Sequence, residues 1–124
     1  MGVFSVTIEV GDPEGRRFER VEAVVDTGAS YTQLPASMLR QLGVRADEMR
    51  TFVMADGRRE QSEIGQTWAR LNGIPRMIMV VFAEEGTQPL VGAVTLQEFG
   101  LGIDTVGEKL IPVPGYRLHR RASA

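Results

Sequence analysis

Cysteine is absent from this chain of 124 residues, and histidine occurs once, at His119. Without cysteine there are no disulfides, no zinc ribbons and no thiol nucleophile. His119 stands in a basic stretch near the C-terminus, where we expect a solvated side chain, so a Ser-His-Asp triad and a histidine-rich metal site are excluded as well. Any chemistry must therefore use carboxylates, hydroxyls or backbone groups, and we expect neither a metal nor another cofactor.

The chain also lacks an excess of basic charge and a long apolar run. Its formal net charge is −2, whereas a surface that binds nucleic-acid phosphates is basic. The longest apolar run, residues 77–83, is far too short to cross a bilayer, and the N-terminal residues do not have the pattern of a signal peptide. We therefore expect a cytoplasmic protein that binds neither nucleic acid nor membranes.

The remaining composition is that of one globular domain. Hydrophobic residues make up 43% of the chain and charged residues 24%, both within the ordinary range. A chain of this length is expected to form a single core. We predict a domain over residues 1–116 and a disordered basic tail over residues 117–124.

Short strand-like segments separated by turn residues dominate the pattern. The dipeptides Asp56-Gly57 and Asn72-Gly73 are strong hairpin signals, because the turns they form need positive φ. The segment that follows Asp56-Gly57, residues 59–63, is wholly polar, so this hairpin must project into solvent. Strands are expected over residues 3–10, 18–25, 51–54, 59–63, 66–71, 74–82, 89–92, 101–104 and 110–113.

Two short helices complete the expected elements, over residues 35–42 and 95–99. Pro35 lies near the start of the first helix, and Gly43 follows its end. Thr95 or a neighbour is expected to cap the second helix, which Gly100 stops. Parallel crossover units are not indicated, and the predicted fold class is all-β.

One acidic tripeptide, Asp26-Thr27-Gly28, stands where a strand meets a turn. It follows the apolar pair Val24-Val25 and precedes Ala29-Ser30. Burying a carboxylate at the end of a strand costs free energy, so its presence there favours a functional role. Since Asp-X-Gly is also common turn chemistry, the tripeptide alone leaves a catalytic site and a plain strand-to-turn junction open.

Several motifs, in this order, resemble those of the single-domain retropepsin-like aspartic proteases. Residues 24–30 look like the active-site signature of that family, and the hairpin over residues 55–58 is similar to its flap, which closes over substrate. Leu90-Val91-Gly92 and the segment over residues 96–101 resemble the strand and helix that pack behind the active loop. The resemblance covers about residues 6–104. It implies an all-β closed barrel with a flap hairpin and one or two short helices.

The resemblance also implies roles for individual residues. Asp26 supplies the catalytic carboxylate, the Thr27 hydroxyl hydrogen-bonds across a dimer axis, and Gly28 lets main chain approach without a Cβ. Leu90, Val91 and Gly92 support the active loop. The residues expected to contact substrate are Ala29, Ser30, Tyr31, Met54, Ala55, Asp56, Gly57 and Arg58.

The chemistry needs a second carboxylate, which the chain does not offer in a matching motif. Two carboxylates that share one proton hydrolyse peptides in this class, because like charges so close together cannot both ionise. Only one Asp-Thr-Gly is present. We therefore predict a homodimeric aspartic endopeptidase that acts on a peptide or protein with Asp26 from each subunit. The alternative is a non-catalytic dimeric β-barrel that binds a peptide or partner protein in the same cleft.

The chain departs from the viral pattern at two places that normally form an ion pair. Viral members usually have an aspartate soon after the signature and an arginine just after the glycine of the later strand. Here Ser30 and Ala93 stand at those places. Because both partners are replaced together, we expect a different brace behind the active loop.

Overall fold

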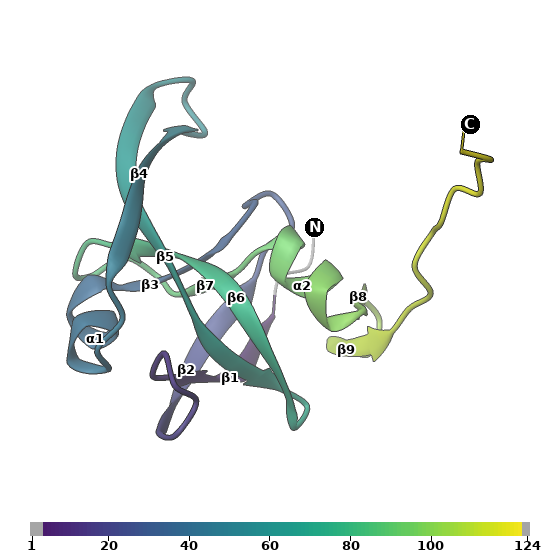
Figure 1. The fold of residues 1–124 in the computed structure, drawn as a ribbon, viewed down its shortest axis with the longest axis horizontal. Coiled ribbons are helices and arrows are strands. Elements are labelled where there is room, and N and C mark those ends of the chain that lie inside the picture. Colours follow the sequence, from purple (N-terminus) through teal and green to yellow (C-terminus); the bar gives the residue numbers. More distant parts are fainter. Residues whose placement is uncertain (1–3, 123–124) are drawn as a thin grey trace.

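The computed structural model describes residues 4–122, which form one β-rich body with two short helices (Figure 1). The expected strand over residues 3–10 is observed from residue 5, and Val3 lies outside the described residues. The elements are β1 (Ser5–Gly11), β2 (Phe18–Val25), β3 (Thr32–Pro35), α1 (Ala36–Gln41), β4 (Ala46–Val53), β5 (Arg59–Leu71), β6 (Ile74–Ala83), β7 (Leu90–Val91), α2 (Ala93–Phe99), β8 (Leu101–Asp104) and β9 (Lys109–Pro112).

The main sheet closes on itself. Its strands run in the order β1-β2-β7-β3-β6-β5-β4, and β1 also pairs with β5 through Glu9 opposite Arg70 and Val10 opposite Ala69. This pairing joins six strands into a ring and leaves β4 attached to β5 alone. The predicted barrel is therefore observed.

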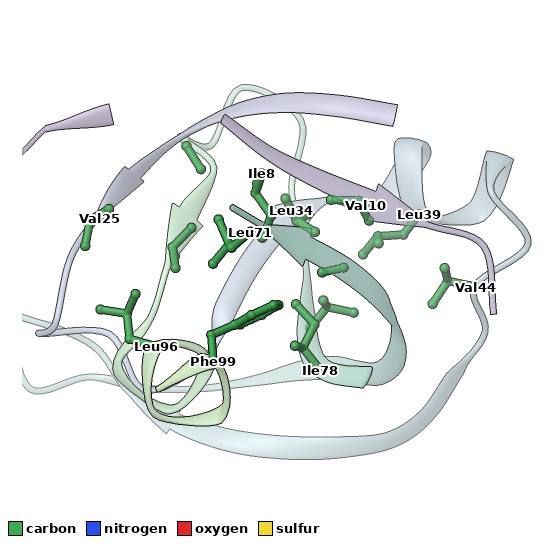
Figure 2. Close-up of a cluster of buried hydrophobic side chains, with 14 of the residues drawn as sticks. Ile8, Val10, Val25, Leu34, Leu39, Val44, Leu71, Ile78, Leu96 and Phe99 are labelled. Carbon is green, nitrogen blue, oxygen red and sulfur yellow. The ribbon is translucent and has the colours of Figure 1, made fainter. Parts of the chain in front are cut away.

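Alternating inward side chains fill the barrel, as the period of two residues in a strand requires. Ile8, Leu34 and Val80 are fully buried, and Leu96 and Phe99 of α2 pack against the same cluster (Figure 2). Helix α2 follows β7 directly and packs against β6 and β3. This packing fixes α2 relative to the residues that follow β2.

A projecting hairpin, residues 46–63, extends beyond the barrel (Figure 1). It consists of β4 and the outer part of β5, which pairs with β4 alone, whereas β5 from Ile64 onward pairs with β6. The two strands expected over residues 59–63 and 66–71 are thus one strand of 13 residues. The polar segment continues the ladder where no core lies beneath it, so the expectation that it projects is confirmed.

Two sequence expectations are wrong. Strands β2 and β7, and likewise β3 and β6, pair in parallel, although no crossover unit is indicated by the sequence. Helix α2 begins at Ala93, and Thr95 does not cap it, since Gly92 occupies the cap position and Thr95 is buried. Gly100 ends α2 in the left-handed conformation, as predicted.

The C-terminal part leaves the barrel. Strands β8 and β9 form a separate two-stranded sheet, and residues 113–122 have no regular secondary structure and extend away from the barrel (Figure 1). Disorder over residues 117–124 stays a prediction. No helix within residues 4–122 has both the length and the apolar character needed to cross a membrane.

Candidate active site

The Asp26 loop, residues 26–31, connects β2 to β3. Its first residue is fixed by the parallel pairing of β2 with β7, because the Asp26 N–H donates a hydrogen bond to the Val91 carbonyl at 3.1 Å. One residue earlier, the Val25 N–H donates to the carbonyl of Phe4 at 2.9 Å. The backbone at Asp26 is therefore held between two neighbouring chain segments.

The Asp26 carboxylate is half-buried and is held by its own turn. Its Oδ1 accepts a hydrogen bond from the Gly28 N–H at 2.9 Å, and the Ala29 N–H donates to the Asp26 carbonyl at 3.2 Å. A Cβ at Gly28 would lie 3.1 Å from Oδ1, which is tighter than an ordinary contact. The hydrogen bonds formed among residues 4–122 leave Oδ2 uncommitted, so one carboxylate oxygen is available to a ligand.

Helix α2 braces the Asp26 loop from behind. The N–H groups of Ala93 and Val94 donate to the carbonyls of Ala29 and Ser30, each at 2.9 Å. These N–H groups belong to the first turn of α2, which has no intrahelical partner for them. The loop carbonyls thus accept hydrogen bonds from N–H groups that the helix itself cannot pair, and the same hydrogen bonds fix the loop against α2.

Gly92 permits this close approach. A Cβ there would lie 2.6 Å from the carbonyl carbon and oxygen of Tyr31 and 2.7 Å from the Ser30 oxygen, and real Cβ atoms do not come so near to backbone. The φ of Gly92 is −91°, so its backbone conformation would suit other residues. Absence of a side chain, not conformational freedom, is what this position requires.

A buried pair of threonines, Thr32 and Thr95, completes the brace. Their hydroxyls are hydrogen-bonded at 2.6 Å, and the Thr32 Oγ1 also accepts the Gly92 N–H at 3.3 Å. Both side chains are almost fully buried, with exposed fractions of 0% and 2%. Among residues 4–122, the hydrogen bonds that connect the Asp26 loop with α2 run between backbone groups, and the side chains of Ser30 and Ala93 form no ion pair.

The sequence prediction misses these two threonines. One signal for Thr95 was present, since it stands four residues before the buried Phe99 and therefore on the same face of a helix. Thr32 likewise alternates with the buried Leu34 along β3. Periodicity places both side chains inside, but it does not show that they meet.

Tyr31 connects the Asp26 loop to the projecting hairpin. Its hydroxyl accepts a hydrogen bond from Nη1 of Arg50 at 2.8 Å, and its ring meets the ring of Phe52 edge to face at 6.1 Å. Arg50 is also paired with Glu48 at 2.9 Å, and this carboxylate raises the pKa of Arg50 above its ordinary value. The sequence does not identify Arg50 or Glu48 as part of the site.

The predicted substrate residues 54–58 lie together at the tip of the projecting hairpin. The Met54 N–H donates to the Arg58 carbonyl at 2.7 Å, and Gly57 has a φ of +89°. Asp56 accepts the backbone N–H of Arg58 at 3.0 Å, which is the main cause of its lowered pKa, and also binds the Arg58 guanidinium at 2.6 Å. Figure 1 shows this tip at the far end of the hairpin, beyond the barrel.

A groove of about 520 Å³ runs along the projecting hairpin. Its walls include Met54 of the tip, Glu60 of the outer part of β5, Gln33 of β3 and Phe82 of β6. None of the residues 26–31 of the Asp26 loop lines this groove. Across residues 4–122, no group of three or more His, Cys, Asp or Glu side chains is placed to hold a metal ion.

The similarity to known proteins agrees with this geometry. A model of the family described as gag-polyprotein putative aspartyl protease matches residues 17–98, which include the Asp26 loop, the projecting hairpin and most of α2. No curated protein matches the chain significantly in sequence.

Solved structures of the retropepsin type have the same fold. A retropepsin-like aspartic protease from Rickettsia conorii has a TM-score of 0.54 at 20% identity, with 83% of this chain and 86% of that chain covered. The simian foamy virus protease has a TM-score of 0.54 at 16% identity, and the match covers 76% of this chain and 92% of that chain. The retroviral protease-like domain of Ddi1 from Leishmania major has a TM-score of 0.53 at 19% identity, and the match covers 87% of each chain. The fold of residues 4–122 is therefore retropepsin-like.

Replacing Gly92 with alanine tests the close approach of α2 to the Asp26 loop. Because the added Cβ meets backbone that cannot rotate away, we expect Gly92→Ala to lower the free energy of unfolding by about 2 kcal/mol or more. Urea unfolding of the purified protein measures this. Gly115→Ala is the control, since nothing lies within 4 Å of a Cβ at Gly115. Equal stability of the two variants would contradict the account.

A double-mutant cycle tests the threonine pair. Thr32→Val and Thr95→Val each leave a buried hydroxyl without its partner, and we expect each to cost about 1–3 kcal/mol of unfolding free energy. The double variant should cost less than the sum, because the second substitution removes the stranded hydroxyl. Strict additivity would show that the two side chains do not interact. Thr105→Val, at an exposed position, should change little.

Proposed function

Because this chain belongs to the family of gag-polyprotein putative aspartyl proteases, we propose that it is a homodimeric aspartic endopeptidase in which each subunit supplies one Asp26 carboxylate. The observation that carries the proposal is the Asp26 loop itself. Its carboxylate is held at a strand end by backbone hydrogen bonds, with Oδ2 left free. Asp56 and Asp104 make the same kind of turn hydrogen bond, so what distinguishes Asp26 is its loop, which is paired with β7 and braced from behind by α2.

The other aspartates of the described chain support a requirement for two subunits. Asp12 accepts the backbone N–H of Arg16 at 2.7 Å, and Asp104 accepts that of Val106 at 3.1 Å, so each serves its own turn. Asp56 serves the tip of the projecting hairpin in the same way. The fourth, Asp47, is exposed in β4, and none of the four stands in a second Asp-Thr-Gly. In contrast, Thr27 and Gly28 are exposed in the single chain and are free to meet a second copy.

In the proposed dimer the two Asp26 carboxylates share one proton, because like charges so close together cannot both be present. The ionised carboxylate takes a proton from a bound water, whose oxygen attacks the carbonyl carbon of the scissile peptide. The protonated carboxylate hydrogen-bonds to the carbonyl oxygen as it gains negative charge. Breakdown of the tetrahedral intermediate cleaves the C–N bond, and a proton from the pair passes to the leaving amine.

The projecting hairpin is proposed to act as the flap. Residues 54–58 would close over the bound peptide, exclude water and donate backbone hydrogen bonds. Ala29, Ser30 and Tyr31 would contact the peptide from the side of the Asp26 loop. The groove along the hairpin gives the rest of an extended peptide a place to lie.

Replacing Asp26 with asparagine tests the catalytic role. Because general acid and base catalysis contributes about 10²–10⁴-fold, we expect Asp26→Asn to lower the rate of peptide cleavage by at least about a thousandfold, without loss of the dimer. The assay uses a peptide library at mildly acidic pH, with a statine-type transition-state mimic as inhibitor. Asp47→Asn is the matched control at an exposed position.

An active Asp26→Asn variant would disprove the assignment. Binding of peptides without cleavage by the wild-type dimer would favour the alternative, a non-catalytic β-barrel that binds peptides in the same cleft. A chain that sediments as a monomer even with the inhibitor present would contradict the shared pair of carboxylates.

A further inference from the structure

The contact between Tyr31 and Arg50 crosses from the Asp26 loop to the projecting hairpin. We propose that these two side chains are positioning residues, which hold the hairpin at a set place above Asp26. The effect of this contact on catalysis rests on the proposed function. The contact itself, which ties the projecting hairpin to the Asp26 loop, is a property of the fold. Neither residue touches the reacting atoms in this role.

Tyr31 gives the contact a rigid base. It is the last residue of the Asp26 loop, and β3 begins at the next residue. Its carbonyl lies so close to Gly92 that a Cβ there would approach it to 2.6 Å. Because helix α2 thus confines the backbone of Tyr31, its ring is a fixed point against which the hairpin rests.

Arg50 is oriented before it reaches Tyr31. Its Nε and Nη2 donate to the two carboxylate oxygens of Glu48 at 3.0 and 3.1 Å, which leaves Nη1 directed at the Tyr31 hydroxyl at 2.8 Å. Glu48 and Arg50 are two residues apart and therefore on one face of β4. The guanidinium carbon also lies 5.6 Å from the centre of the Tyr31 ring, within the range of a cation–π contact.

Phe52 extends the same row toward the tip. It stands two residues after Arg50, and its ring meets Tyr31 edge to face. The opposite face of β4 has no such contact, since Met49 and Val53 are 55% and 66% exposed. The hairpin has no core of its own, so its direction depends on pairing between its strands, on this row of contacts with Tyr31 and, at its base, on the ion pair of Glu63 with Arg40 of α1 at 2.7 Å.

The geometry makes the tip sensitive to this contact. Met54 lies four residues beyond Arg50, a distance of about 13 Å along an extended strand. A small rotation at Arg50 therefore produces a larger displacement at residues 54–58. If the contact is lost, residues 54–58 become more mobile, and substrate binding must order them. This raises KM. The reacting groups keep their positions, so kcat changes little.

Hydrogen exchange of the full-length protein tests the coupling without reference to activity. In Tyr31→Phe, which keeps the ring and removes one hydroxyl, and in Arg50→Met, we expect amides of residues 51–61 to exchange about five- to tenfold faster. The double variant should exchange no faster than Arg50→Met alone, because both substitutions break one contact.

Arg70→Met is the matched control. Arg70 makes the same two kinds of contact, an ion pair with Glu9 at 2.9 Å and a cation–π contact with Phe18 at 3.7 Å, but at the barrel end of β5. It should leave exchange of residues 51–61 unchanged. Unchanged exchange in Tyr31→Phe, or equal acceleration in Arg70→Met, would overturn the proposal. If Arg50→Met does not fold, Tyr31→Phe decides alone.

Kinetics of peptide cleavage give the second readout. Arg50→Met, at a residue that is not expected to contact substrate, should raise KM about three- to tenfold and leave kcat within about twofold of the wild-type value. A fall in kcat at constant KM would contradict a positioning role. If the wild-type protein cleaves no peptide, the proposed function fails, while hydrogen exchange still decides whether Tyr31 and Arg50 hold the hairpin.

Discussion

The candidate site depends on the close approach of helix α2 to the Asp26 loop. Two N–H groups at the start of α2 bind two carbonyls of the loop, and Gly92 allows the backbones to come together. Helix α2 is fixed in turn by Leu96 and Phe99, which pack into the barrel (Figure 2). The position of the Asp26 carboxylate is thus set by the core through one short helix.

The brace contains no charged side chain between the loop and α2. A buried ion pair costs desolvation of both charges, and its benefit depends on geometry. The Thr32–Thr95 hydrogen bond, by contrast, is neutral, and its hydroxyls are both satisfied in the interior. The same fold therefore supports its loop here with threonine hydroxyls and backbone groups. A charged side chain does contact the Asp26 loop from the projecting hairpin, where Arg50, paired with Glu48, donates a hydrogen bond to Tyr31.

Local signals in the sequence predict much of this arrangement. Asp56-Gly57 and Asn72-Gly73 mark their hairpins because the turns need positive φ. The apolar pair Val24-Val25 places Asp26 at a strand end, and the polar residues 59–63 identify the part of the chain that leaves the barrel. In each case the cause lies within a few residues of the effect.

Contacts between distant residues are what the sequence does not reveal. Thr32 and Thr95 are 63 positions apart, and Tyr31 and Arg50 are 19 apart, so only the tertiary fold brings each pair together. The parallel pairing of β2 with β7 likewise depends on how long connections pack around the core. Residue types at these positions indicate burial or polarity, but not the partner.

The central claim is that two copies of the Asp26 loop form one site. An experimental structure of the protein in solution or in a crystal, with an inhibitor bound, measures the separation of the two Asp26 carboxylates directly. The account predicts a two-fold axis with the carboxylates about 3 Å apart, close enough to share a proton. Carboxylate oxygens of the two subunits more than about 3.5 Å apart, too far for one hydrogen bond, would contradict it.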